Sequence, residues 1–442
     1  MKKQILNMFG VAVLALLLPA CAQQAPVVAP PPPAETTSNG AANGNGGVNG
    51  DVTVIDEDHH GIGVRVISAE EWFDTHPEVV ASYLRTAERD EFYSYLELNP
   101  YKRTLFEGFG FALDYNSPRP HIFSMEGLDM TGRYPFRQRA NCFACKSANY
   151  PAVRDYLGVE FYALSFEEMR GLMTQPVSCF NCHGNEPPYA RVMAHYVFDA
   201  FPDISMVSPG SATCAQCHIE YHFDPVTFEV ILPYSGLDTM HPVDALWYFN
   251  NVATMPDGRP FADYVNPRSG VRQIKVQHPE FEAVYGRYSF HNSLAPVGMA
   301  FSCADCHMPF HESAEGVVYR SHEKVSPLAD AQLVQNSCAM CHSDLYSEVR
   351  AIQEIYYTRV HSLGEHLASL MERLVLAVES GEHSEETLDE IRYTFRNAQF
   401  FWDWVVSENS NGAHNSRLIF STIEYGWSYA NEVEALLVQL GY

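Results

Sequence analysis

The chain is poor in basic residues. Its 442 positions carry 28 lysines and arginines against 54 aspartates and glutamates, and the formal net charge is −26. Proteins that bind nucleic acid generally need a basic surface, so the composition argues against that class. The sequence also offers no apolar run of about 20 residues near its start, the length that a membrane-spanning helix requires. The shorter run VAVLALLLPA follows Lys2 and Lys3 and ends at Cys21, so residues 1–20 are interpreted as a secretory signal peptide.

The segment after this signal has the composition of a tether. The LPAC sequence that ends at Cys21 resembles a bacterial lipobox, which implies a lipid anchor on that cysteine. Residues 21–52 are rich in proline, glycine and asparagine and almost uncharged, and such a segment cannot form a core. We therefore expect an exported protein of the periplasm or cell envelope, anchored to a membrane by lipid, whose folded part begins at residue 53.

Apart from Cys21, no cysteine stands outside a Cys-x-x-Cys pair. The ten others form five pairs: Cys142 and Cys145, Cys179 and Cys182, Cys214 and Cys217, Cys303 and Cys306, and Cys338 and Cys341. A histidine follows four of these pairs, at His183, His218, His307 and His342, whereas Lys146 follows the first. Disulfides are common in exported proteins and zinc also uses paired cysteines. Neither explains the recurrent histidine. Covalent attachment of c-type haem does, because the residue after the pair ligates the iron.

The five pairs show no fixed repeat, since successive first cysteines are 37, 35, 89 and 35 residues apart. This spacing favours a single compact multihaem domain over residues 53–343 rather than a string of modules. From residue 344 to 442 the apolar positions recur at helical spacing with few breakers, which predicts long C-terminal helices. Strand signals are few and short, as in GVRVIS at 63–68. The expected fold class is mainly α.

Lys146 is the exception that bears on function. A histidine after the pair and a second histidine from elsewhere close both axial positions of an iron and make an electron carrier. A lysine amine ligates iron only when it is deprotonated, and the opposite side of that iron could then bind a substrate. The alternative is that Lys146 is a solvated neighbour, another side chain ligates this iron, and the protein only transfers electrons.

One Cys-x-x-Cys-Lys motif followed by four Cys-x-x-Cys-His motifs resembles the pattern of the pentahaem cytochrome c nitrite reductases, which form ammonium. The segments CAQCHIEYHF, IKVQHPEFE and DYNSPRPHIFSMEGLDMTGR also resemble segments of that family. The resemblance covers residues 71 to about 415. It implies a six-electron reduction of nitrite to ammonium at the Lys146 haem, fed with electrons by four haems that each have two histidine ligands.

The resemblance places three catalytic residues around this haem: Arg133, Tyr221 and His278. Their chemistry suits nitrite, because a guanidinium and an imidazole can hold an anion and a phenol can donate a hydrogen bond. Each has an alternative role. Arg133 could pair with a haem propionate, as could Arg137 or Arg139, and His278 could be an axial ligand or a core histidine.

The resemblance also implies metal ligands at further positions. One calcium ion would be bound by the Glu220 carboxylate, the backbone carbonyls of Tyr221 and Lys275, and the Gln277 side chain, all of them oxygen donors. A plain salt bridge between Glu220 and Lys275 is the alternative. The four second histidine ligands would be His322 for the Cys179/Cys182 haem, His76 for the Cys214/Cys217 haem, His414 for the Cys303/Cys306 haem and His291 for the Cys338/Cys341 haem.

Several partners follow from this interpretation. Besides five haems and calcium, we expect nitrite as substrate, a membrane quinol dehydrogenase or a small periplasmic cytochrome as electron donor, and a homodimer built by the C-terminal helices. Two other functions stay open: a non-catalytic electron-transfer cytochrome, and the same fold acting mainly on hydroxylamine or sulfite.

Overall fold

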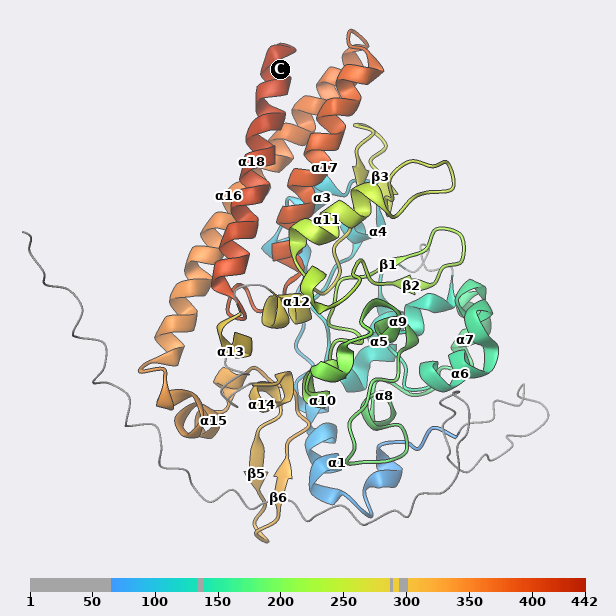
Figure 1. Ribbon diagram of the computed structural model, residues 1–442, viewed down its shortest axis with the longest axis vertical. Coiled ribbons are helices and arrows are strands. Elements are labelled where there is room, and N and C mark those ends of the chain that lie inside the picture. The colour runs from blue at the N-terminus through green and yellow to red at the C-terminus, as the bar shows by residue number, and fades with distance from the viewer. Residues whose placement is uncertain (1–64, 134–138, 287–288, 294–300) are drawn as a thin grey trace, which may run out of the picture. The chain divides into compact units, whose positions relative to one another are not determined.

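Helices make up most of the regular structure in this computed structural model (Figure 1), which describes residues 65–133, 139–286, 289–293 and 301–442. All of these belong to one compact unit, Gly50–Tyr442. The predicted signal peptide, the linker over 21–52 and the anchor at Cys21 lie outside the described residues. Within them, no helix is both long enough and apolar enough to cross a membrane.

Most helices before residue 344 have ten residues or fewer. They are α1 (Pro77–Leu84), α2 (Tyr95–Leu98), α3 (Lys102–Leu105), α4 (Gly110–Leu113), α5 (Ser124–Met130), α6 (Tyr150–Leu157), α7 (Phe166–Arg170), α8 (Cys179–His183), α9 (His195–Ala200), α10 (Pro209–Ala212), α11 (Pro242–Asn251), α12 (Glu280–Tyr285), α13 (Phe290–Ser293), α14 (Cys303–His307) and α15 (Ala331–Asn336). Two 3-10 turns also matter for the site, at Ala140–Phe143 and Cys338–Met340.

Two of the Cys-x-x-Cys-His motifs are complete short helices. In α8 and α14 the residue before the first cysteine, Ser178 or Ser302, forms a capping box with a residue inside the motif, Asn181 or Asp305. Because a capping box satisfies two backbone N–H groups at a helix start, even these five-residue helices are locally defined. Residues three apart lie on one helical face, so both cysteines of each motif face the same side.

Strands are few in the described residues, and they form three antiparallel pairs: β1 (His222–Phe223) with β2 (Val230–Ile231), β3 (Tyr264–Val265) with β4 (Arg272–Gln273), and β5 (Phe310–Glu312) with β6 (Val318–Arg320). The strand expected at 63–68 is wrong for its described part, because residues 65–68 have no strand partner. Side chains satisfy this backbone instead: Ile67 N–H donates to Asn185, and Val66 C=O accepts from Gln175. The mainly helical prediction is confirmed.

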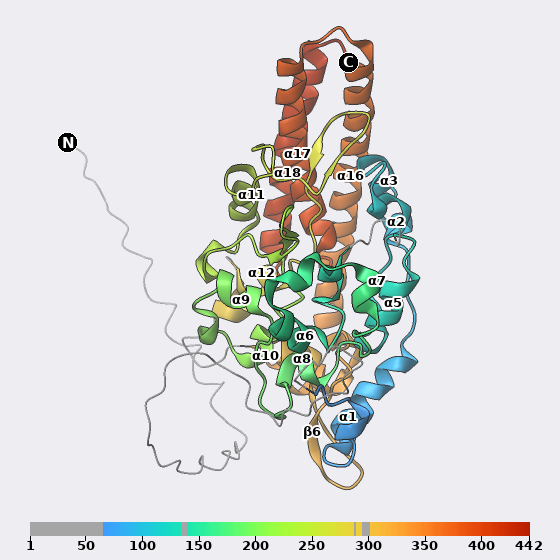
Figure 2. The ribbon, with the colours of Figure 1, turned by 90° about the vertical axis from the view of Figure 1, so that its right-hand side faces the viewer.

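The predicted long C-terminal helices are α16 (Leu345–Ser380), α17 (Glu385–Ser407) and α18 (Ser416–Gln439), which lie side by side in both views (Figures 1 and 2). Asp344, Ser384 and Asn415 cap their N-termini through side-chain hydrogen bonds. Gly381 ends α16 in the left-handed conformation that glycine favours, with φ +68°.

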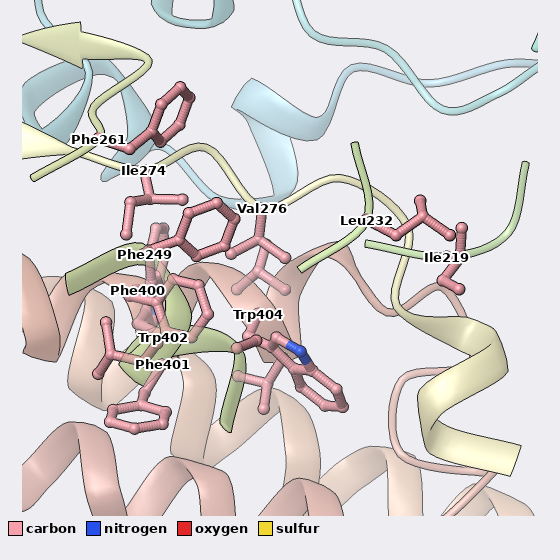
Figure 3. Close-up of a cluster of buried hydrophobic side chains, with 14 of the residues drawn as sticks. Ile219, Leu232, Phe249, Phe261, Ile274, Val276, Phe400, Phe401, Trp402 and Trp404 are labelled. Carbon is pink, nitrogen blue, oxygen red and sulfur yellow. The ribbon is translucent and has the colours of Figure 1, made fainter. Parts of the chain in front are cut away.

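The core joins these helices to the part of the chain that carries the motifs. Phe400, Trp402 and Trp404 of α17 are fully buried, and the close-up in Figure 3 shows them beside Ile274 and Val276. The indole N–H of Trp402 donates to the Val360 carbonyl of α16 over 3.0 Å. Residues 274–276, which include the predicted calcium ligand Lys275 and directly precede Gln277 and His278, are therefore held against the buried helix α17.

Candidate functional site

No disulfide joins any of the ten described cysteines, so the structure gives the five pairs no disulfide role. In the described part of the chain, no three histidine, cysteine, aspartate or glutamate side chains gather in an arrangement that could hold a metal ion. The cysteine pairs therefore do not converge on a zinc site. Each pair instead sits on its own turn, with its histidine or lysine next to it.

Three of the four expected histidine pairs lie together. The ring centroids are 6.2 Å apart for His183 and His322, 6.1 Å apart for His307 and His414, and 6.2 Å apart for His291 and His342. Two imidazoles on opposite sides of one metal, each bound over about 2 Å, have centroids roughly 6 Å apart. The three pairs therefore fit an iron between their rings.

The remaining histidine motif, which ends at His218, differs from the expectation. Two imidazoles lie near His218: the centroid of His121 is 6.5 Å away and that of His278 is 6.4 Å away. His76 instead contacts Thr75 and Trp72 and interacts electrostatically with His183. The placement of His76 opposite His218 is therefore wrong.

His121 rather than His278 can lie opposite His218 across a haem. His218 and His278 each place Nδ1 within 4.0 Å of the Glu280 carboxylate, so no porphyrin plane can stand between those two rings. His121 is buried, and burial followed by the charges of Lys324, His218 and Lys146 keeps its pKa well below the usual range. The sequence carries a signal for this residue, because His121 lies inside DYNSPRPHIFSMEGLDMTGR, the segment that resembles the pentahaem reductases and ends at Arg133.

The three predicted catalytic residues all lie within electrostatic range of the Cys142–Lys146 turn. Tyr221 interacts electrostatically with Cys145 and Cys142, Arg133 with Tyr221 and Cys142, and His278 with Lys146. Burial raises the pKa of Tyr221 well above its usual value, so the phenol keeps its proton. The structure thus brings together side chains that are up to 145 positions apart in the sequence.

Arg133 is held by a loop that is organised around Asp114. The Asp114 carboxylate accepts from the Thr131 hydroxyl over 2.7 Å and from the Gly132 N–H over 2.5 Å. Thr131 then accepts from Arg133 Nε over 3.2 Å, and the guanidinium carbon lies 4.1 Å from the centre of the Phe111 ring. Arg139 donates instead to the Ala163 carbonyl and lies over Phe228. Arg137 lies outside the described residues.

His278 is half-buried, and burial lowers its pKa to about 4, although the Glu280 carboxylate opposes this shift. Its imidazole is therefore neutral at pH 7. Its buried surroundings make proton exchange at neutral pH harder than for an ordinary imidazole. A neutral imidazole still has one N–H donor and one nitrogen acceptor, so it can still orient an anion or a water molecule.

Three of the predicted calcium ligands, Glu220, Lys275 and Gln277, lie close together. One oxygen of Glu220 accepts from the Gln277 backbone N–H over 2.6 Å, while the other is buried without a hydrogen bond to any described residue. The side-chain N–H of Gln277 donates to the Lys275 carbonyl over 2.9 Å. Burial, followed by nearby Glu282 and Asp263, raises the pKa of Glu220 well above its usual value. An unsatisfied carboxylate beside carbonyl oxygens is the donor set that calcium prefers.

The Lys275 ammonium does not occupy this cluster. It pairs with Asp403 of α17 over 3.0 Å, and Lys102 of α3 pairs with the other oxygen of the same carboxylate over 2.5 Å. Asp403 also accepts from the Val276 N–H over 2.9 Å. All three ionic side chains are at most 1% exposed. This ion triad anchors residues 275–276 to α17, and it leaves the Glu220 carboxylate free for a cation.

Residues 218–221 and 277–282 brace each other. The Phe281 N–H donates to the His218 carbonyl over 3.0 Å, and the Glu220 N–H donates to the Glu282 carboxylate over 2.7 Å. With the bond from Gln277 to Glu220, these contacts fix one segment against the other. Each segment supplies a distal-pocket residue and a candidate calcium ligand, so the two sites share one frame.

Comparison with known proteins shows the family of the chain. A family model described as cytochrome c552 matches residues 68–441. Proteins named cytochrome c-552 from Bacteroides thetaiotaomicron and Porphyromonas gingivalis are 27% and 28% identical over 378 and 373 residues. Each alignment covers 78% of this chain and, respectively, 71% and 70% of the relative. The catalytic subunit of cytochrome c nitrite reductase from Desulfovibrio desulfuricans, described with two calcium sites, superposes with a TM-score of 0.73. It is 25% identical over 84% of this chain and 86% of its own.

Proposed function

Because this chain belongs to the cytochrome c552 family, we propose that it is an ammonia-forming nitrite reductase with its active site at the Cys142–Lys146 turn. One observation carries the proposal: the only attachment motif with lysine in place of histidine is also the one with which Arg133, Tyr221 and His278 all interact electrostatically. A plain electron carrier has no need of an arginine and a tyrosine at one haem.

The proposed protein holds five haems through its ten paired cysteines. The axial ligands would be Lys146 for the first haem, His183 and His322 for the second, His218 and His121 for the third, His307 and His414 for the fourth, and His342 and His291 for the fifth. The haem irons supply the electrons that nitrite takes up. Lys146 fits its role when it ligates as a neutral amine, because metal coordination removes the proton from a lysine.

The side chains of the pocket bind and orient the substrate. Arg133 offers a planar pair of N–H donors to the two oxygens of nitrite, and its contact with Phe111 restricts its rotation. Tyr221 keeps its phenolic proton and can donate it in a hydrogen bond. His278 approaches the same space from residues 277–282. Reduction of nitrite to ammonium consumes six electrons and eight protons, so hydrogen-bond donors next to the substrate are required.

Calcium belongs to the same proposal. Glu220, the Tyr221 and Lys275 carbonyls and the Gln277 side chain would hold one ion, which would neutralise the buried carboxylate and fix Tyr221 and His278 through their chain neighbours. We expect about one calcium per chain by elemental analysis. Glu220→Gln keeps the hydrogen bond from Gln277 but loses the charge, so it should lower the calcium content and activity. Calcium retained at one ion per chain in this variant would exclude Glu220 as a ligand.

The cellular setting is also proposed. The protein would be anchored in the cell envelope through Cys21 and act in the periplasm. It would take electrons from a membrane quinol dehydrogenase or a small periplasmic cytochrome. We further propose a homodimer through the C-terminal helices, because exposed aromatic side chains, among them Tyr393 and Tyr425, remain on α17 and α18.

The direct test is the ammonium yield from nitrite with reduced viologen as electron donor. Near-quantitative conversion by the haem-loaded protein is expected, together with one high-spin haem whose EPR signal changes on addition of nitrite or cyanide. Five low-spin haems that are inert to both ligands would leave only electron transfer. Parallel kinetics with hydroxylamine and sulfite rank the three substrates, and a much higher kcat/KM for either alternative would reject nitrite as the main one.

A further inference from the structure

Glu280, the first residue of α12, lies between two histidines that have different roles in the proposed function. Its side chain is almost fully buried, with 7% of the residue exposed. One carboxylate oxygen is 3.7 Å from His218 Nδ1, and the other is 4.0 Å from His278 Nδ1. His218 would ligate the third haem, whereas His278 faces the substrate pocket of the first. One carboxylate thus faces both imidazoles from the side away from their Nε2 atoms.

A short polar chain fixes the carboxylate in this place. The Asn409 amide donates to Glu280 Oε1, and the Tyr95 hydroxyl donates to Asn409 Oδ1 over 2.6 Å. Tyr95 and Asn409 also line a cavity of about 20 Å³, together with Tyr93, Tyr356 and Asn411. This volume is that of about one water molecule. The two hydrogen bonds hold the Glu280 carboxylate, so it is not free to turn away.

Glu280 does not belong to an ordinary structural salt bridge. Among the described residues its ion pairs are with His218 and His278 only, and neither a lysine nor an arginine lies within 4.0 Å. Its Oε2 atom and His278 Nδ1 are both buried without a hydrogen bond in the described structure.

We infer that Glu280 is a positioning residue shared by the two neighbouring sites, turning Nε2 of His218 toward the third haem iron and Nε2 of His278 toward the substrate. The geometry of imidazole carries this step, because the two ring nitrogens point to opposite sides and a partner at Nδ1 orients Nε2. For His218 there is a second effect. A carboxylate at Nδ1 makes an axial imidazole a stronger electron donor, which stabilises the oxidised iron and lowers its reduction potential.

The part of this inference that concerns His278 rests on the proposed function, whereas the part that concerns His218 needs only a haem at Cys214 and Cys217. The test uses Glu280→Gln in the haem-loaded protein, since glutamine keeps the size of the side chain and a hydrogen-bond acceptor for Asn409. Glu348→Gln is the matched control, because Glu348 lies 2.7 Å from Nδ1 of His342, an attachment histidine outside the pocket.

Two readouts are expected to change together in Glu280→Gln. In EPR-monitored potentiometric titration the midpoint potential of one low-spin haem should rise, and kcat for nitrite should fall about 10-fold, the lower end of the usual loss for an outer-shell partner of a metal ligand. The nitrite-induced change of the high-spin signal should need more nitrite. In Glu348→Gln a different low-spin haem should shift, and the high-spin signal should respond to nitrite as in the wild type.

The outcomes separate this inference from the proposed function. Unchanged potentials in Glu280→Gln would overturn the inference, even with an active wild type. A shifted potential with unaltered nitrite response and kcat would overturn the shared role. If the wild type forms no ammonium, but the variant shifts both the potential and the cyanide affinity of the high-spin haem, the inference stands and the reductase proposal fails. If Glu280→Gln does not load haem, the test uses Asn409→Ala, which removes the amide that donates to Glu280. This variant must shift the low-spin midpoint potential and the response of the high-spin haem in the same directions. The absence of these two shifts also overturns the inference.

Discussion

At the scale of single residues, function depends on differences between chemically similar positions. Five Cys-x-x-Cys motifs are alike except for Lys146, and eight of the 19 histidines are proposed to ligate iron. The neighbouring residues distinguish one such position from another. Asp114 organises the loop that presents Arg133, and Glu280 faces His278. The roles of Arg133 and His278 are therefore separable by substitution.

Arg133→Lys keeps a positive charge but loses the planar pair of donors, so we expect a raised KM for nitrite and a lower kcat.

His278→Asn keeps hydrogen-bonding capacity but removes the imidazole. It should lower kcat by roughly 100-fold, within the range for a general acid–base group, and release partly reduced nitrogen species. Steady-state kinetics with product analysis checks both. Arg139→Lys is the control, because the Arg139 guanidinium donates a hydrogen bond to the Ala163 carbonyl instead. Wild-type kcat in His278→Asn would assign proton donation to Tyr221 or water.

At the scale of elements, the long C-terminal helices depend on close contacts as well as on apolar periodicity. Gly364 of α16 faces Tyr101 and Trp402, and Gly426 of α18 faces Leu363. Both glycines let neighbouring side chains approach the helix backbone. The buried pair of Lys102 and Asp403 then ties α3 to α17. Periodicity predicted these helices, whereas the contacts between them became visible only in the structure.

Gly364→Ala should destabilise the protein. A Cβ atom there would lie 2.7 Å from Tyr101 Cδ2 and 2.9 Å from Trp402 Nε1, and it would displace the indole that donates to Val360. Overpacking of this kind costs about 1–3 kcal/mol, against a gain of up to about 1 kcal/mol in helix propensity. Denaturant unfolding of the haem-loaded protein measures the net loss. Gly171→Ala, where no atom lies within 4 Å, should lose nothing. Equal stability of the two variants would contradict the close packing.

Stability should depend on pH through Lys102. Burial lowers the pKa of Lys102 to about 8, although the Asp403 carboxylate raises it in part. A lysine in the unfolded chain has a pKa near 10.4. Between about pH 8 and 10 the unfolded state therefore binds more protons, and the free energy of unfolding should rise with pH. Lys102→Met should lack this rise, whereas Arg103→Met, at an exposed neighbouring position, should keep it. Parallel pH profiles of wild type and Lys102→Met from pH 7 to 10 would refute the shift.

At the scale of the whole molecule, one groove suits the proposed dimer. It has a volume of about 540 Å³ and lies between α11, α17 and α18, where it is lined by Trp247, Tyr393, Tyr425 and Tyr429 among others. Trp247 is 61% exposed and Tyr393 is 49% exposed. Exposed aromatic clusters of this kind are typical of protein interfaces, and this one includes two of the helices that were predicted to dimerise.

Light scattering on haem-loaded protein lacking residues 1–50 should give the mass of two chains. Tyr425→Glu places a charge in the groove and should shift the mass toward one chain at low micromolar concentration. Tyr156→Glu, at a 56% exposed position on α6, should leave the dimer intact. A single-chain mass for the unsubstituted protein would reject the dimer, and a dimer that persists in Tyr425→Glu would move the interface to another face.

The sequence by itself determined the five Cys-x-x-Cys motifs, the unusual lysine and the long helices. Each is a local property: two cysteines three positions apart and the next residue are adjacent in any fold, and helical periodicity is read within one segment. The composition of the pocket also came from short segments around Arg133, Tyr221 and His278, because those segments resemble a family.

The tertiary structure alone decided which distant residues meet. His121, not His76, lies opposite His218, and no sequence spacing predicts that pairing because it depends on how loops fold over one another. The same holds for Lys275, whose ammonium pairs with Asp403 of α17 and leaves Glu220 free to bind a cation. Glu280 acquires its place between two imidazoles only when residues 218 and 278 are brought together. Long-range pairs are chosen by burial and by the need to satisfy buried charges, and both are properties of the folded chain.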